Sequence, residues 1–538
     1  MIKIKNALPK SIFIFTLYYS KELNFLYYNS SDSPDFPTYF NYFKYFFLEI
    51  ENTSREQGLF YYLLNSWKFY SFSDSLNSVN FFIYLHKSIQ QTNFYLYLFG
   101  VLGMYYLLKH FRFSQNSIFY TLALLNFLPF IMAMRIVLKP EIIGFAMFPW
   151  VILCFEKYLI DNKLLYLYLS IPFLAICISA KGSVLVMVAL YLLIFYFFKV
   201  IGMDFKKVIL PIFLLALVTL SIYIEDSSAN EASIIELQSG STQSQNYDFK
   251  APKNIVYKID IYKLLTSPKK YDHSNSTIAI TLLDTFGDYF DVYWDNDASN
   301  YASERKIIFE YTESNSIKAP IFDMEQTKLT VYDQKVPDLY LREFVGLIIS
   351  IVFYVFLILY IAKKNQYSKF LVAPLLALSI LLVHVITGYP VNNFDPSKGD
   401  TLKTIYYSFF LSISFIFLYA QTIENKKYKK LITLPLIIMM LFLLGFPKEN
   451  SLEFSNNISN INNYSHFCTT NNLLMFQNMD DAPLSKCKQS NEIQILGYGE
   501  YKDYSDFKRI PRLALTNVLV GIASILSSVF VISTFYKD

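Results

Sequence analysis

Two carboxylates three residues apart, Asp32 and Asp35, lie in the Ser/Pro-rich segment NSSDSPDFP. A carboxylate at a membrane surface can act as a general base that takes the proton of an attacking hydroxyl group. Asp beside Ser and Pro also suits a turn that caps a following helix. Two interpretations therefore stand: catalysis by Asp35 or Asp32, or capping of the next helix.

The residues that follow this pair have the spacing of a helix lying along a membrane surface. Aromatic or apolar residues recur at positions 36, 39, 40, 43, 46, 47 and 50, while Asn41, Lys44 and Glu49 fall on other faces. A second short apolar segment, 59–64, follows a charged stretch. Such helices would hold the two carboxylates at the edge of the bilayer.

Composition places the chain among polytopic membrane proteins. Its 538 residues are 54% hydrophobic and only 17% charged, with a mean hydropathy of +0.31. A soluble protein of this length would carry far more charge. The net charge of +4 is small, and the excess Lys lies in short loops, which argues against nucleic acid as a partner.

The hydrophobic segments predict an all-α protein with about twelve transmembrane helices, each near the ~20 residues that cross the hydrocarbon core. The predicted spans are 11–28, 93–109, 117–134, 141–156, 164–180, 183–199, 208–224, 343–362, 369–387, 403–421, 431–446 and 512–534. They divide the chain into an N-terminal membrane module (1–225, with a first external loop 29–92), an external insert (226–342), C-terminal helices (343–446), an external loop (447–511) and a last helix (512–538).

The Lys/Arg bias of the loops predicts that both termini are cytoplasmic. The block of four Lys within KKYKK (426–430) and the three Lys of the first ten residues then share one side with most other loop cations. Cys468 and Cys487 fall in an external loop, where they could form a disulfide. Cys154 and Cys177 lie inside hydrophobic segments and are interpreted as inert packing residues.

Cations also lie in two very short turns on the predicted external side. The stretch MRIVLKPEIIGF contains Arg135, Lys139 and Glu141, and ISAKGSVL contains Lys181. Arg135 and Lys139 could hold the phosphate of a lipid carrier, with Glu141 orienting one of them. Lys181, beside Gly182, could also reach a phosphate. Lys and Arg also flank membrane spans generally, but cations on the external side run against the usual bias.

Two further features could bind a substrate. The acidic and aromatic run from Asp284 to Asp297 could hydrogen-bond sugar hydroxyls, although a solvated surface is the simpler interpretation. A divalent metal is possible there, but the spacing matches no calcium loop, and the chain has no His cluster. His384 lies near the external end of a span, where a polar group is usually buried for a reason.

These features together resemble the GT-C superfamily of integral-membrane glycosyltransferases, which use polyprenyl-phosphate sugars. The superfamily includes the protein mannosyltransferases and the aminoarabinose transferases of lipid A. SPDFPTYF matches the place of the family's first-loop Asp, EQGLFYYLL that of its second surface helix, and RIVLKPE its basic turn. The resemblance is best over residues 1–225. Asp-x-x-Asp replaces the adjacent acidic pair of some members, and the insert 226–342 falls unusually in mid-chain.

The resemblance implies an inverting hexosyl or pentosyl transfer with an optional divalent metal. Asp35 would deprotonate an acceptor hydroxyl on a glycolipid, polysaccharide or protein. That hydroxyl would attack the anomeric carbon of a sugar on undecaprenyl phosphate or a similar carrier. Arg135, Lys139 and Lys181, with His384 nearby, would hold the departing phosphate. The expected location is a bacterial inner membrane, with the site on the extracytoplasmic face.

Other classes of function fit part of the pattern. About twelve spans suit a transporter or flippase, but transporters concentrate polar residues at mid-membrane, whereas these charges gather at the rim. A polysaccharide polymerase or ligase of envelope biogenesis would also act at the outer face, typically with Arg-rich loops. A non-catalytic scaffold would use the first-loop Asp only as a helix cap.

Overall fold

A computed structural model of the chain describes residues 2–27, 60–70, 81–135, 138–202, 205–206, 208–216, 258–268, 273, 276–286, 304–305, 334–335, 339–386, 404–424, 492–494 and 501–503. The predicted catalytic pair Asp32 and Asp35 and the predicted disulfide Cys468–Cys487 lie outside these residues. His384 lies in a described helix, without a described side chain.

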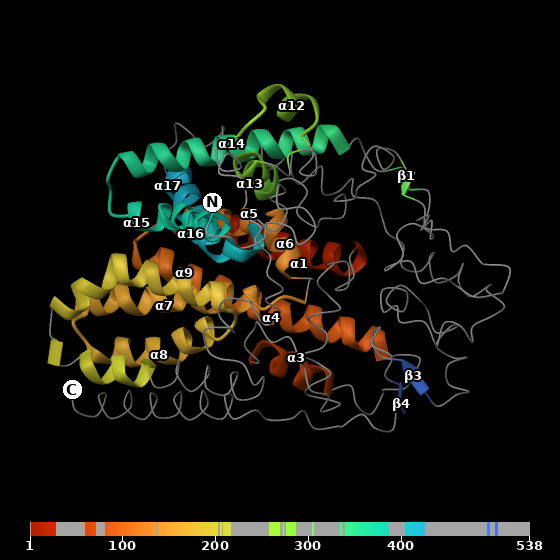
Figure 1. Ribbon diagram of the computed structural model, residues 1–538. Coiled ribbons are helices and arrows are strands. Elements are labelled where there is room, and N and C mark those ends of the chain that lie inside the picture. Colours follow the sequence, from red (N-terminus) through yellow and green to blue (C-terminus); the bar gives the residue numbers. More distant parts are fainter. Residues whose placement is uncertain are drawn as a thin grey trace.

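The described residues form a bundle of helices (Figure 1). The N-terminal part contains α1 (Ile2–Tyr27), α3 (Phe60–Tyr70), α4 (Phe81–His110), α5 (Gln115–Leu125), α6 (Pro129–Met134), α7 (Glu141–Asp161), α8 (Leu164–Ile178), α9 (Gly182–Leu192) and the π-helix η2 (Leu193–Phe197). The later part contains α12 (Ile261–Thr266), α13 (Thr277–Phe286), α14 (Leu339–Ala362), α15 (Ser368–Leu371), α16 (Ala373–Ile386), the 3-10 helix η5 (Thr404–Tyr407) and α17 (Ser408–Glu424).

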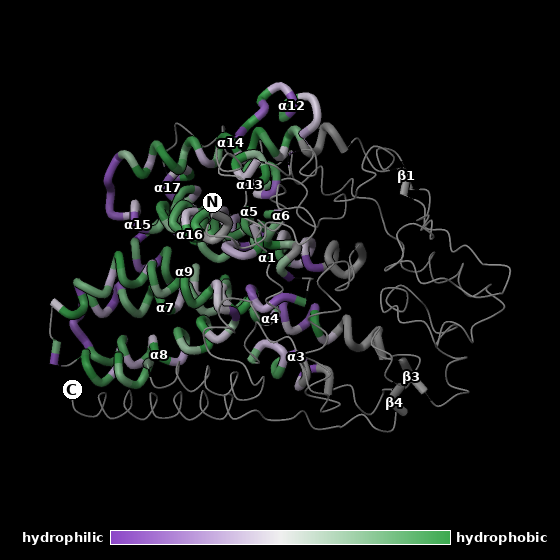
Figure 2. The backbone as a smooth tube through the Cα atoms, in the orientation of Figure 1, coloured by the Kyte–Doolittle hydropathy of each residue, from purple (hydrophilic) through white to green (hydrophobic). Residues whose placement is uncertain are grey.

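Among the residues that the structure describes, four helical segments are long and apolar enough to cross a membrane: Glu141–Asp161, Gly182–Gly202, Phe344–Ala362 and Thr404–Glu424. The first and last are 78% and 89% buried, whereas the other two are 33% and 39% buried. The two less buried segments therefore present apolar side chains outward, and Figure 2 shows that α14 and α9 consist mainly of hydrophobic residues. Exposed apolar helix faces of this length identify an integral membrane protein.

Helix α7 occupies the centre of the bundle and packs against α4, α8 and α17. Its crossing with α4 is close because Gly100 of α4 faces Phe145: a Cβ atom at Gly100 would come within 2.6 Å of the Phe145 ring. Gly144 of α7 similarly faces Phe409 of α17. Small residues at these crossings let helix backbones approach one another.

The helices coincide with most of the predicted spans that fall in the described residues, with two interruptions. The predicted span 117–134 is two helices, α5 and α6, because Pro129 cannot continue the hydrogen-bond ladder of α5. The predicted span 369–387 is divided between α15 and α16 at Val372, just before Pro374. The total of twelve spans stays a prediction.

Two pairs of short antiparallel strands lie in segments predicted to be external. β1 (Glu304–Arg305) pairs with β2 (Gln334–Lys335), and β3 (Glu492–Gln494) pairs with β4 (Tyr501–Asp503). The membrane part of the described chain is helical throughout. Cys154 and Cys177 are buried and unpaired, as the sequence predicts for packing residues.

Candidate functional site

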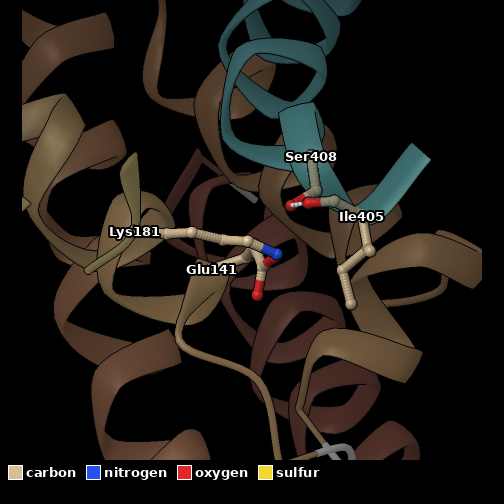
Figure 3. A network of polar contacts seen from close by, with 4 residues as sticks. All are labelled: Glu141, Lys181, Ile405 and Ser408. Atoms are coloured by element: carbon tan, nitrogen blue, oxygen red, sulfur yellow. Dashed lines mark hydrogen bonds and ion pairs between the residues drawn. The ribbon is translucent and has the colours of Figure 1, made fainter. Parts of the chain in front are cut away.

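The structure brings Glu141 and Lys181 into contact, although they are 40 residues apart in the sequence. The Lys181 Nζ atom donates to Glu141 Oε1 at 3.1 Å. Figure 3 shows the two side chains pointing toward one another, beside Ile405 of η5 and Ser408 of α17. Glu141 is fully buried, and its second oxygen, Oε2, has no hydrogen-bond partner. The sequence predicts that Glu141 orients Arg135 or Lys139, whereas the ion pair that the structure shows for Glu141 is with Lys181.

Lys139 lies beside this ion pair, and the ring of Tyr406 connects the two lysines. The ammonium of Lys181 is 4.4 Å from the Tyr406 ring centroid, and that of Lys139 is 5.8 Å from it. Both distances suit a cation–π interaction. Lys139 is buried, and Tyr406 is partly exposed. Two ammonium groups and one carboxylate therefore share one region, with a net positive charge.

The local backbone adds to this positive character. Glu141 begins α7, and Lys181 immediately precedes α9; neither helix has a side-chain cap. The N-terminal end of a helix carries a partial positive charge and unpaired N–H groups. Since Glu141 and Lys181 touch, these two helix ends lie side by side. Two lysines and two helix ends carry more positive charge than the Glu141 carboxylate neutralises, so the arrangement favours the binding of a further anion.

The electrostatics of the pair keep Lys181 charged. Burial is the largest single effect and lowers the pKa of the Lys181 ammonium, but the charge of Glu141, the hydrogen bond to it and Tyr406 together raise it, so the pKa lies above its ordinary value. The ammonium thus stays charged, and paired with Glu141, throughout the physiological pH range.

Arg135 belongs to a different network, between α1, α4 and α5. Its guanidinium donates to Ser20 Oγ and to the Asn126 carbonyl, each at 3.0 Å, and lies 4.8 Å from the Tyr97 ring centroid. Tyr97 in turn donates to Asn126 Oδ1. Burial lowers the pKa of Arg135 to about 10, so it stays charged at neutral pH. These contacts place Arg135 as an anchor of the turn that carries Lys139 and Glu141, and a role in phosphate binding stays a prediction.

Asp284 has a structural role that the sequence did not predict. We expected the acidic run from Asp284 to be mainly a solvated surface, but Asp284 is buried. Its Oδ2 atom accepts hydrogen bonds from the backbone N–H and the hydroxyl of Thr404, at 2.5 and 2.6 Å. Asp284 of α13 therefore caps the start of η5, which carries Tyr406. The rest of the run lies outside the described residues.

Helix α7 has a second buried carboxylate, Glu156, near its other end. Glu156 lies 15 residues, or about 22 Å along the helix, from Glu141. Lys369 of α15 and the hydroxyl of Tyr196 in η2 both donate to Glu156 Oε1. The cluster joins three helical elements. One signal could have found it: a glutamate inside an apolar span needs a partner.

Sequence reasoning missed Tyr406 and the polar residues near the α3–α4 contact, because nothing in their local sequence distinguishes them from other aromatic and amide residues.

Among the residues that the structure describes, no group of three or more His, Cys, Asp or Glu side chains could hold a metal ion. No protein-family model matches the chain, and neither a curated protein nor a solved structure matches it.

Proposed function

We propose that this membrane protein is a glycosyltransferase that takes a sugar from a polyprenyl-phosphate carrier and transfers it to an acceptor hydroxyl. One observation carries the proposal: Lys139 and Lys181 converge with two uncapped helix ends at one end of α7. This arrangement supplies what a lipid-linked phosphate needs, namely fixed positive charge beside apolar helices. A phosphate at that place could keep its polyprenyl chain in the bilayer.

The chemistry follows from the charge at the reacting centre. An acceptor hydroxyl loses its proton to a general base and forms a bond to the anomeric carbon of the sugar. The bond between that carbon and the phosphate oxygen breaks, and the polyprenyl phosphate leaves with one more negative charge. Lys139 and Lys181 stabilise the charge that develops on this leaving group, in a buried setting where such stabilisation is strong.

The proposed base is Asp35, with Asp32 as the alternative, and both lie outside the described residues. The support for a base in the first loop comes from the position of α3, which lies within that loop and packs on α4. Tyr61 of α3 is buried close enough to Glu141 for the carboxylate to raise the pKa of its phenol, although burial is the larger cause of the rise. Tyr61 of α3 therefore lies near Glu141, the ion-pair partner of Lys181.

The location of the ion pair also bears on the transporter alternative. A buried Glu–Lys pair can serve a proton-coupled transporter, but such pairs lie near the middle of the membrane. Glu141 and Lys181 lie at the first residue of α7 and directly before α9, which places them at helix ends. This position favours a site for a carrier at the bilayer surface. We place that surface on the extracytoplasmic side.

The experiment is a transfer assay on membranes that contain the protein, with labelled undecaprenyl-phosphoryl hexoses and pentoses as donors. Wild type should release sugar from at least one donor, and Asp35→Asn should lower the rate by about 10²- to 10⁴-fold while inserting normally. Unchanged transfer by Asp35→Asn makes Asp32 the base to test next by Asp32→Asn. No transfer from any donor, together with no binding of undecaprenyl phosphate, would refute the proposal.

A further inference from the structure

We propose that Asn65, Tyr61 and Glu141 form a subsite for the hydroxyl groups of the donor sugar, next to the lysines that hold its phosphate. The inference rests on the proposed function and names the part of the site that recognises sugar. It places the sugar between helix α3, helix α4 and the first turn of α7.

Two buried oxygen atoms in this region lack a hydrogen-bond donor. Glu141 Oε2 and Asn65 Oδ1 have no partner, and both residues are 0% exposed. They are the only acceptor-only atoms among the unpartnered buried side-chain atoms of the described residues. A buried acceptor without a donor costs about 1–3 kcal/mol, so the fold retains these two at a cost to stability.

Tyr61 connects the two unpartnered oxygens. Its hydroxyl donates to Asn93 Oδ1 at 2.8 Å, which fixes the phenol against α4, and the Asn65 side chain and the Lys139 backbone also hydrogen-bond to this phenol. Asn65 lies one helical turn after Tyr61 on the same face of α3, where its Nδ2 atom donates to the Tyr61 carbonyl at 2.9 Å. The Glu141 carboxylate is close enough to raise the pKa of the Tyr61 phenol, which burial raises most.

The position of α3 is held by contacts that leave these acceptors unused. Ser88 of α4 donates to the Asn65 carbonyl at 2.8 Å, and Asn93 Nδ2 donates to the Met134 carbonyl at 3.4 Å. The second bond ties the same face of α4 to Met134, the last residue of α6. Helix α4 packs against both α3 and α7, and Tyr61 of α3 lies within the electrostatic reach of Glu141 at the start of α7; we call this region the polar junction.

The chemistry of the junction selects its ligand. The two unpartnered atoms, Glu141 Oε2 and Asn65 Oδ1, accept hydrogen bonds, so a ligand there must supply donors. A sugar does so with its hydroxyl groups, and a sugar attached to a phosphate would bring them within reach when Lys139 and Lys181 hold that phosphate. A site built to bond hydroxyls discriminates strongly against a ligand that lacks them, because its acceptors then stay unpaired.

The test compares two probes on the purified full chain in lipid nanodiscs. One is bare undecaprenyl phosphate, and the other is undecaprenyl phosphate carrying glucose, mannose or arabinose. For wild type, at least one sugar should tighten binding about 10-fold over the bare lipid. Asn65→Leu should remove most of that gain while changing the binding of bare undecaprenyl phosphate less than about 2-fold.

Tyr61→Phe is the second variant, used if Asn65→Leu does not fold, and it should reduce the same sugar-dependent gain. The matched control is Thr121→Val on α5, which removes another buried unpartnered oxygen away from the junction. It should leave both affinities unchanged. Equal weakening of both probes by Asn65→Leu, or wild-type binding without any gain from sugar, would overturn the subsite and leave the phosphate site standing. Failure of wild type to bind either probe would instead refute the proposed function.

Discussion

Helix α7 has a buried glutamate near each end, and each glutamate is paired with a lysine. At Glu156, a single oxygen accepts from both Lys369 and Tyr196. At Glu141, one oxygen accepts from Lys181 and the other has no donor. The same two residue types therefore form a cluster with two donors on one carboxylate oxygen at one end, and an incompletely bonded cluster at the other.

The difference shows how a buried ion pair can be assigned to structure or to function. The Glu156 cluster connects α7, η2 and α15. We interpret it as a structural clamp between these helices. The Glu141 cluster adds a second lysine, Lys139, and an aromatic ring, Tyr406, beside two uncapped helix ends. Extra positive charge together with an unpaired acceptor indicates a place for a ligand.

The largest expected effect concerns the lysine of the Glu141 cluster. Lys181→Met removes a cation that we expect to stabilise the leaving phosphate, so transfer from an undecaprenyl-phosphoryl sugar should fall about 10²- to 10³-fold. The measurement is the initial rate per folded molecule in nanodiscs. Lys181→Arg keeps the charge and should retain part of the activity. A Lys181→Met rate within a few-fold of wild type would contradict a phosphate role for this lysine.

The matching change at the Glu156 end of α7 should affect stability alone. Lys369→Met leaves the Glu156 carboxylate without its cation, which should lower the free energy of unfolding by about 3 kcal/mol. Chemical or thermal unfolding in detergent measures this loss. Donor affinity of the folded fraction should stay within about 2-fold of wild type. A Lys369→Met protein that is stable but does not bind donor would remove the distinction between the two ends.

The crossing of α4 and α7 holds both clusters in place, so a change there should weaken both. Gly100→Ala would place a Cβ atom 2.7 Å from the Phe145 carbonyl oxygen, which should cost about 1–3 kcal/mol of stability. Gly202→Ala is the matched control, because a Cβ atom there meets nothing within 4 Å. Thermal unfolding should separate the two variants. Equal melting temperatures would show that the crossing is looser than described.

The contribution of Tyr406 should be smaller. Tyr406→Leu removes the ring that lies over both ammonium groups, and a cation–π interaction at a partly exposed site contributes about 0.5–1 kcal/mol. Because the ring orders the two lysines, donor KM should rise about 2- to 5-fold with kcat little changed. Tyr406→Phe keeps the ring and should match wild type. Loss of activity in the Phe variant would assign a role to the hydroxyl instead.

The smallest expected effect is a pH dependence near the Glu156 end, where His110 ends α4. Burial lowers the pKa of His110, with Glu156, Lys157, Asp161 and Lys369 as its charged neighbours. The unfolded chain therefore binds a proton more readily than the folded protein, so stability should decrease as the pH falls below about 6.5. His110→Gln should reduce this dependence in unfolding measurements between pH 5 and 8. An unchanged pH profile would refute the assignment to His110.

The sequence predicted much of the architecture because apolar segments of membrane length have few alternatives to helices. Helices α7, α9, α14 and α17 coincide with predicted spans. The interruption of the span 117–134 at Pro129 was not predicted, because the apolar residues on both sides outweighed a single proline in the hydropathy pattern. The sequence predicted charges at these helix ends, but it assigned Glu141 to Arg135 or Lys139 of its own turn, whereas the ion pair in the structure joins it to Lys181 of another turn.

The rest of the site depends on contacts between distant segments. Asp284 bonds to Thr404, 120 residues later, and no local pattern relates the two. Arg135 lies one turn before Lys139 in the sequence, but packing directs it toward Ser20 and Asn126. Tyr406 looks like any aromatic residue at the start of a span. Such pairings follow from the tertiary arrangement of α1, α4, α7 and α17, which periodicity does not specify.

The most direct test of the central claim is to map where the lipid-linked phosphate binds. An undecaprenyl phosphate that carries a photoreactive diazirine next to the phosphate is crosslinked to the protein in nanodiscs, and the labelled peptides are identified by mass spectrometry. We predict labels on peptides that contain Lys139, Lys181 or Tyr406, competed away by unlabelled undecaprenyl phosphate. Labels confined to peptides around Glu156, Tyr196 or Lys369 would contradict the account.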